Sequence, residues 1–228
     1  IVRLGWSHGD QEIFSVDEMI KLFELKNINK SSASFNQEKL DWINHSYIKT
    51  TEINELVSEL EWHLNKLSID LSDGPDIKEV VEVLRDRSKS LVDMAKNCVM
   101  FYHDFEIYCT GDHTDFFLNS YGEGVDIRDL ADLDFWENSL PVLGDLLERL
   151  EPLKQWTAEH IHKVIQDICE SRNIGFGEVG QPFRLAISGE YKSGSIDKSA
   201  QLVGKKRVLH RLNVFFNLIR EELENSRR

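Results

Sequence analysis

At 228 residues the chain is long enough for one large domain or two small ones. A composition of 41% hydrophobic and 29% charged residues, with only 4 prolines, excludes a disordered chain and favours a helix-rich one. No apolar run approaches the roughly 18 residues that cross a bilayer, and the 3 cysteines contain no C-x-x-C pair, which disfavours a disulfide or a zinc site.

The net charge of −13 argues by itself against a nucleic-acid partner, but the charge is unevenly distributed. Residues 183–228 hold ten Lys and Arg against five Asp and Glu, whereas residues 1–182 hold 17 against 35. Residues 112–151 hold eleven acids and two arginines. A polyanion is therefore expected to approach the C-terminal end and to avoid the acidic middle.

Helical signals dominate the first half of the chain. Ser15 and Glu18 form a capping-box pattern that predicts a helix start before the apolar residues 19–23. Apolar residues at spacings of three and four predict a second helix from about residue 51 to the Ser-Asp-Gly-Pro turn at 72–75. The same spacing predicts one further helix from Asp76 through Met94. Residues 98–121 are rich in aromatic side chains and are compatible with a helix or with irregular packing.

In the second half, helical spacing returns at residues 140–150 and again in a last apolar stripe at 208–223. Between them, cap and turn residues predict three helices. The first is expected from Thr157 to Gly175, the second from Pro182 to Gly189, and the third from Ser195 to Gly204. No segment alternates like a strand, so the expected fold is all-α, with a boundary near residues 151–156.

One constellation resembles an enzyme site in its residue types. His103 and Asp104, with His63 and with Asp115 or Asp167, are the kinds of ligand that hold metal ions in phosphohydrolases. No further spacing supports this, and a partly exposed helix with polar residues is the simpler interpretation. The sequence contains neither a phosphate-binding glycine loop nor a G-x-S-x-G elbow.

Residues 177–212 are the segment best suited to RNA. They contain Arg184 at an expected helix start, Gly/Ser turns around Ser193, and the row Lys205, Lys206 and Arg207. Proteins that read single-stranded RNA bind splayed bases on their edges and stack them on planar groups. An ordinary basic face is the alternative.

The two ends of the chain also resemble bacterial glutamyl-tRNA synthetases. LGWSHGDQEIFS from Leu4 and KSSASFNQEKLDWINHSYIK from Lys30 resemble the segment just after the ATP-binding signature of that family. QPFRLAISG from Gln181, Ser193 to Ile196, and LVGK at 202–205 resemble its Q-P-L-R-x-A-x-T/S-G, T/S-P-x-L/I and L-G-K/R stretches. HIGH-type and KMSKS-type signatures do not occur in the sequence. The resemblance therefore implies a tRNA-reading part without the part that activates glutamate.

For the fold, the resemblance implies two helical bundles that form an anticodon-binding α-helical cage, preceded by a remnant of the helical stem-contact region. The expected boundaries are 1–50 for the stem-contact region, 51–152 for the first bundle and 153–228 for the second.

By position, the resemblance places Arg184, Ser193 and Ile196 at the first two anticodon bases and Arg87 at the third, with Arg85 as the alternative match. An arginine at that third-base position implies a parent enzyme that accepts tRNA(Glu) and rejects tRNA(Gln). The residues expected at the tRNA stem or backbone are Lys30, Lys39, Trp42, Lys205, Lys206 and Arg207. Gly194 stands where the family usually has proline, so a looser turn is expected there.

The implied partner is tRNA(Glu), with neither DNA nor a membrane, and the expected protein is monomeric and cytoplasmic. No cofactor is expected in this chain, while ATP and Mg are implied for the missing catalytic part that ligates glutamate to tRNA(Glu). Two alternatives stay open: a helical scaffold whose acidic face docks a basic protein, and a metal-dependent phosphohydrolase.

Overall fold

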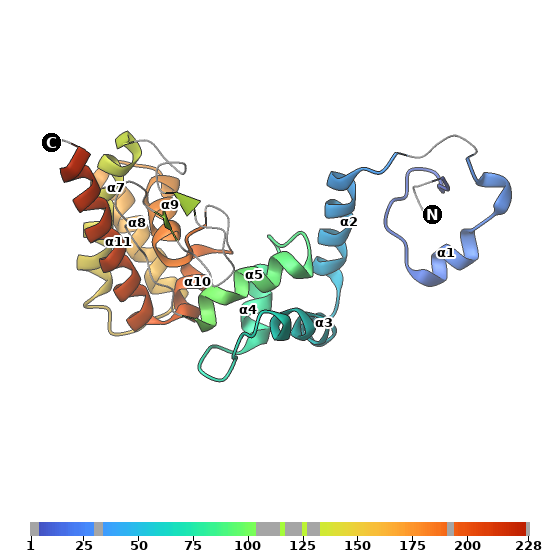
Figure 1. Ribbon diagram of the computed structural model, residues 1–228, viewed down its shortest axis with the longest axis horizontal. Helices are drawn as coiled ribbons and strands as arrows, with labels where there is room; N and C mark the ends of the chain where they lie inside the picture. The colour runs from blue at the N-terminus through green and yellow to red at the C-terminus, as the bar shows by residue number, and fades with distance from the viewer. Residues whose placement is uncertain are drawn as a thin grey trace.

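The computed structural model describes residues 5–29, 34–103, 115–116, 125–126, 133–190 and 194–226. Figure 1 shows an elongated molecule. Its N-terminal region lies at one end and leads through helix α2 (Gln37–Thr50) to a small group of helices and then to a larger bundle at the other end. None of the helices in the described ranges is long and apolar enough to cross a membrane.

The N-terminal region has its own small aromatic core. The Trp6 side chain is 1% exposed, and its ring lies 5.8 Å from that of Phe14 and 5.7 Å from that of Phe23. Helix α1 (Val16–Leu22) begins at the capping box of Ser15 and Glu18, which confirms that prediction, and a short 3-10 turn, η1 (Leu25–Asn27), follows. Aromatic burial thus orders a segment that contains little helix.

Helix α3 (Ile53–Lys66) follows α2 almost without a loop. It starts beside the predicted position, with Glu52 as its N-cap, but it ends well before the predicted turn at 72–75. Ser68 adopts a left-handed backbone (φ 53°), which ends the helix early. The apolar residues after Lys66 therefore pack from a loop, as buried Ile69 does.

The single helix predicted from Asp76 through Met94 is wrong, because the chain breaks it into α4 (Ile77–Leu84) and α5 (Leu91–Tyr102). Asp76 caps α4, as expected for its start. Ser90 caps α5 by accepting a hydrogen bond from the Asp93 amide, and this local cap stabilises a new helix start. The intervening turn at residues 85–90 carries Arg85 and Arg87.

The larger bundle consists of α7 (Leu133–Leu150), α8 (Ala158–Arg172), α9 (Phe176–Ser188), α10 (Ile196–Val203) and α11 (Lys205–Ser226). The structure confirms Thr157 as the cap of α8 and Gly189 and Gly204 as the ends of α9 and α10. A two-residue antiparallel pair, β1 (Asp115–Phe116) with β2 (Val125–Asp126), is the only sheet in the described ranges. The predicted all-α class is therefore confirmed.

Two predicted boundaries in this bundle are wrong. Asn173, in the left-handed conformation (φ 53°), ends α8, and Gly175 is the N-cap of α9. Pro182 lies inside α9 and not in its first turn, because the helix begins at Phe176. Asparagine tolerates the left-handed region better than most residues, so it can end a helix as glycine does.

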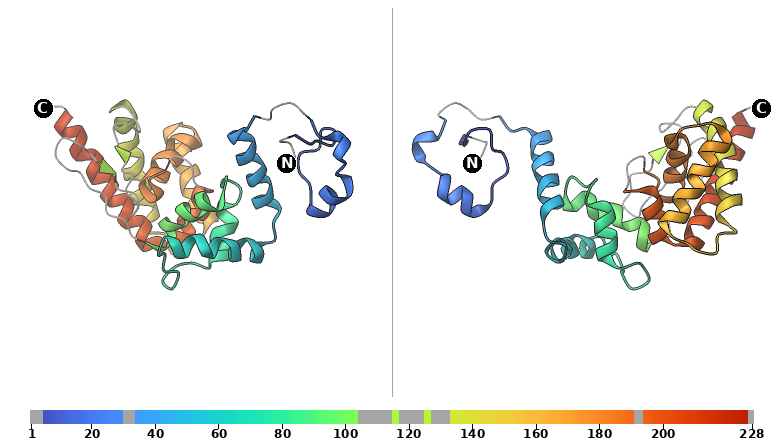
Figure 2. Two further views of the ribbon diagram at one scale, coloured as in Figure 1. Left: turned by 45° about the vertical axis from the view of Figure 1, so that its right-hand side comes forward. Right: turned by 180° about the vertical axis from the view of Figure 1, so that it is seen from behind.

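Helix α10 joins the two groups of helices. It packs against α8, α9 and α11 in the larger bundle, and against α4 and α5 in the smaller one, where α3 packs on both α4 and α5 (Figure 2). Helix α7 packs against α8, α9 and α11, so it lies within the larger bundle. The expected boundary between residues 152 and 153 therefore falls between two helices that pack on each other.

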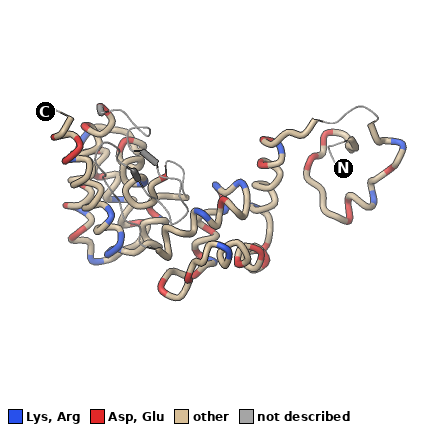
Figure 3. Tube along the Cα trace, in the orientation of Figure 1, with Lys and Arg blue, Asp and Glu red and all other residues tan. Residues whose placement is uncertain are grey.

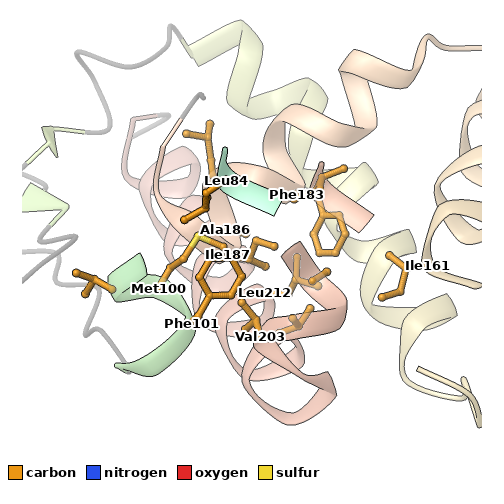
Figure 4. Close-up of a cluster of buried hydrophobic side chains, with 14 of the residues drawn as sticks. Leu84, Met100, Phe101, Ile161, Phe183, Ala186, Ile187, Val203 and Leu212 are labelled. Carbon is orange, nitrogen blue, oxygen red and sulfur yellow. The ribbon is translucent and has the colours of Figure 1, made fainter. Parts of the chain in front are cut away.

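The hydrophobic core is continuous between the two groups. Figure 4 shows side chains of α4, α5, α9, α10 and α11 gathered around one point. The buried residues that meet there include Leu84, Met100, Phe101, Ile187, Val203 and Leu212. Such a shared core makes the relative position of α4 and α9 a consequence of packing and not of a flexible linker.

Arginines of α11 reinforce this junction at the end of α5. Arg211, 2% exposed, donates hydrogen bonds to the carbonyls of Met100, Ile187 and His103, each at 2.9 Å. Arg207 donates to the carbonyl of Phe101 at 3.0 Å. The last carbonyls of a helix lack partners within the helix and carry partial negative charge, so these cations stabilise the end of α5.

Candidate nucleic-acid interface

Two arginines lie near each other where α4 meets the larger bundle. Arg87 follows α4 and is exposed, while Arg184 is half-buried on α9. Burial lowers the pKa of Arg184, and the positive charge of nearby Arg87 lowers it further, with Asp197 opposing both. The Arg184 Nε is buried without a hydrogen-bond partner among the described residues. Two guanidinium groups that are near enough for one to lower the pKa of the other, and that lack ion pairs within the described chain, favour an anionic or acceptor-rich ligand.

The structure separates Arg87 from Arg85, which the sequence left as alternatives. The Arg85 side chain is 15% exposed and turns toward α2. Its NH2 group donates to the carbonyls of Ile48, Lys49 and Thr51 at 3.1, 2.8 and 2.7 Å. Arg85 therefore closes the C-terminal end of α2, where it satisfies carbonyls that the helix leaves free.

The neighbours of Arg87 are also attached to α2. The Ser88 carbonyl lies 2.8 Å from Nδ1 of His45, and Asp86 forms an ion pair with Lys49 at 3.3 Å. Within the described residues, Arg87 alone in the turn 85–88 has no such side-chain or carbonyl contact with α2. The contacts of its neighbours with α2 thus fix the backbone of the turn and leave the Arg87 side chain exposed.

Replacing Arg85 with methionine is expected to destabilise the fold by about 2 kcal/mol, because the α2 carbonyls lose a charged donor. The free energy of unfolding from urea titration measures this. Arg87→Met is the matched control in the same turn, and its effect should stay below about 0.5 kcal/mol because the side chain is exposed. Equal losses in the two variants would contradict the capping role of Arg85.

The start of α10 contributes polar groups that the sequence did not indicate. Asp197 accepts hydrogen bonds from the Ser195 hydroxyl and the Lys198 amide, and its second oxygen lies 3.0 Å from Nδ1 of His162. Burial raises the pKa of Asp197, but these hydrogen bonds and the His162 contact together hold it below its ordinary value. Ser195 itself is exposed, so it is accessible to a ligand.

Ile196 occupies a different environment from the one expected for a base contact. Its side chain is 2% exposed and belongs to the hydrophobic core. It therefore anchors the start of α10, and a contact with a base stays a prediction. Ser193 lies outside the described residues.

The residues expected at the tRNA stem form a separate surface, because α2 lies apart from α9 and α10 (Figure 1). Lys39 pairs with Glu12 at 2.6 Å, and Trp42 is 48% exposed on the same helix. Lys30 lies outside the described residues. The structure therefore separates Lys39 and Trp42 from Arg184, although α2 itself contacts the turn that carries Arg87.

The basic row at the start of α11 divides into structural and exposed residues. Lys205 Nζ donates to the carbonyls of Glu151 and Leu153, both at 2.7 Å, and Arg207 bonds to α5 as described above. Lys206 is exposed. Lys205 and Arg207 thus have internal roles that the sequence did not indicate, and their contact with RNA stays a prediction.

Acidic residues gather elsewhere, on α3 and on the loop that follows it (Figure 3). In the described parts of the chain, no three His, Cys, Asp or Glu side chains are placed to hold a metal ion. Asp104 and the side chain of Asp115, which belonged to the considered metal constellation, lie outside the described part.

Comparison with known proteins assigns the family. The sequence profile of the family described as Anticodon binding domain matches residues 52–216. A glutamate–tRNA ligase of Ruthia magnifica is 45% identical over 214 residues, and one of Vesicomyosocius okutanii is 46% identical over 212. These alignments cover 94% and 93% of this chain but 43% and 42% of those proteins, so the chain spans less than half of their length.

Solved structures agree in fold. The crystal structure of a glutamate tRNA ligase from Elizabethkingia meningosepticum matches with a TM-score of 0.67 at 24% identity, over 94% of this chain and 39% of that one. A glutamate-tRNA synthetase from Elizabethkingia anophelis matches with a TM-score of 0.63 at 25% identity, over 94% of this chain and 38% of that one. Because the profile match spans most of the sequence, this chain belongs to the anticodon binding domain family.

Proposed function

We propose that this chain is the C-terminal, tRNA-reading part of a glutamate–tRNA ligase and that it binds the anticodon of tRNA(Glu). The observation that carries the proposal is the exposed Arg87 beside half-buried Arg184, both without ion pairs among the described residues, at the junction of two helical groups. The similarity to glutamate–tRNA ligases supports the identity of the tRNA. The part that uses ATP and Mg to ligate glutamate belongs to the remainder of such an enzyme, in the cytoplasm.

In this proposal the two arginines read bases and their surroundings hold them in place. Arg184, with Ser193, contacts the first two anticodon bases, and Arg87 contacts the third. A guanidinium group can donate two parallel hydrogen bonds to a base edge, which gives discrimination of about 1–3 kcal/mol for each good pair. Ile196 supports α10 from the core, and Asp197 orients the exposed Ser195 beside the bases.

The remaining predicted contacts are with the tRNA backbone. Lys39 and Trp42 on α2 form one contact surface, to which we assign the tRNA stem. Lys206 is the residue of the basic row that we assign to phosphate, because Lys205 and Arg207 are hydrogen-bonded within the fold.

The packing of α7 supports a second bundle that starts at residue 133 and not at residue 153.

The test is binding to three transcripts, tRNA(Glu), tRNA(Gln) and tRNA(Glu) with a scrambled anticodon, at two salt concentrations. Tighter binding to tRNA(Glu) that persists at the higher salt and disappears on scrambling is the expected result. Phosphate contacts weaken as salt rises and carry no sequence information, so equal, salt-sensitive binding to all three transcripts would contradict anticodon reading.

Lys205 and Lys206 should respond differently to replacement by methionine. Lys206→Met is expected to weaken binding to all three transcripts by the same factor. It should also reduce the slope of log affinity against log salt concentration by about one, because one counterion fewer is released. Lys205→Met should instead lower the free energy of unfolding by about 1–2 kcal/mol, because two loop carbonyls lose their donor. A base-specific effect of Lys206→Met would contradict its assignment to phosphate.

A further inference from the structure

Gly194, just before α10, lies directly against helix α4. A Cβ atom at this position would lie 2.5 Å from Val83 Cγ1 and 2.6 Å from the Val83 carbonyl oxygen. Ordinary van der Waals contacts begin at about 3.4 Å, so any side chain would displace either the loop or the helix. Part of the obstacle is backbone, which cannot rotate away as a flexible side chain can.

This close approach gives the glycine a role other than the looser turn expected from the sequence. Gly194 is buried, and its φ is not among the positive values, so its backbone conformation does not itself require glycine. Glycine is required because the close approach to α4 leaves no room for a side chain at this position.

The contact joins α4, which leads to Arg87, to the start of α10, which packs on the helix that carries Arg184. On one side, Val83 precedes Arg87 by one helical turn, and the amides of Arg87 and Ser88 bond to the Leu84 carbonyl at 3.0 and 3.1 Å. The position of α4 therefore sets the position of Arg87.

On the other side, Gly194 leads into Ser195 and α10, and α10 packs on α9, which carries Arg184. Asp197, two residues into α10, lies near enough to Arg184 to affect its pKa. A change in the distance between α4 and Gly194 would therefore change the positions of both arginines.

We infer that Gly194 is a positioning residue for anticodon reading: its close approach to Val83 sets the spacing of Arg87 and Arg184 to fit neighbouring bases. The inference rests on the proposed function. Gly194 itself need not touch the RNA, because it acts through the helices that carry the two side chains. A shift of about 1 Å between reading groups is enough to lose well-aligned hydrogen bonds.

The test compares Gly194→Ala, Val83→Ala and the double variant with the unmodified chain. The measured quantity is the ratio of dissociation constants for scrambled and correct tRNA(Glu) transcripts, together with the thermal unfolding midpoint. Gly177→Ala is the matched control, since a Cβ there would meet nothing within 4 Å. We expect Gly194→Ala to lower the ratio about tenfold while binding of the scrambled transcript stays the same. Gly177→Ala should leave the ratio unchanged.

The double variant keeps the inference testable if Gly194→Ala alone folds poorly. Removing Val83 Cγ1 takes away the atom nearest to the new methyl group, so Val83→Ala should restore part of the ratio and of the unfolding midpoint. A wild-type ratio in Gly194→Ala, an equal loss for both transcripts, or no recovery in the double variant would each overturn the inference. If the unmodified chain binds correct and scrambled tRNA(Glu) transcripts equally well, the result would instead contradict the proposed function on which this inference rests.

Discussion

Replacing Arg87 with glutamine is expected to reduce the preference for tRNA(Glu) over a transcript altered at the third anticodon base by about tenfold to a hundredfold. Arg87 is exposed, and the turn that carries it is fixed to α2 by Arg85, Asp86 and Ser88. Because the backbone of this turn is already held, binding does not have to order the turn, and more of the hydrogen-bond energy of Arg87 appears as discrimination. Glutamine removes the charge and the paired donors while it keeps a polar side chain.

The effect should be confined to one base and should leave the fold unchanged. Substituted transcripts at each anticodon position, titrated against both proteins, distinguish loss of reading from general loss of affinity. Lys89→Gln is the matched control, because it removes an exposed positive charge two residues away. An Arg87→Gln variant that binds all transcripts more weakly but keeps its preferences would show that Arg87 contacts only phosphate.

Replacing Arg211 with methionine is expected to lower the free energy of unfolding by about 3 kcal/mol, the largest stability effect among these predictions. Arg211 is buried and donates to carbonyls at the ends of both α5 and α9. Methionine fills much of the volume but leaves these acceptors without donors in a dry environment. For a chain of this size, a loss of about 3 kcal/mol corresponds to a fall in the unfolding midpoint of about 6–12 °C.

Arg220→Met provides the comparison on the same helix. Arg220 is exposed, and its guanidinium carbon lies 5.9 Å from the centre of the Phe216 ring, a contact of small energy at an exposed site. Its replacement should cost less than about 1 kcal/mol. If the two variants unfold at the same urea concentration, the carbonyl contacts of Arg211 do not stabilise the junction between the bundles.

Several signals that act within one helical turn were read correctly from the sequence, although Gly175 and Pro182 were not. The capping box of Ser15, the cap at Thr157 and the terminal glycines Gly189 and Gly204 all lie where they were predicted. Each depends on a side chain or backbone conformation that satisfies groups of the adjacent turn, so no distant residue is needed. The family resemblance supplied the approximate arrangement of the bundles in addition.

The break between α4 and α5 was missed because apolar residues keep helical spacing across it. Leu84 and Met94 lie in the core and Leu91 packs against it, yet they do so from two helices. Periodicity records which residues are buried, and it does not record where the backbone changes direction. The Ser90 cap was a visible local signal for the second helix, but the apolar pattern outweighed it.

By itself, the sequence determined the helical class, the starts of α1, α3, α4, α8 and α10 and the set of candidate arginines, because burial patterns and caps are local properties. Only the tertiary structure decided which arginines are free to bind a ligand. Arg85, Lys205, Arg207 and Arg211 donate to backbone carbonyls of segments distant in the sequence, whereas Arg87 stays exposed beside Arg184. All of these side chains are cationic hydrogen-bond donors, so their roles depend on which unsatisfied carbonyls the folded chain brings within reach.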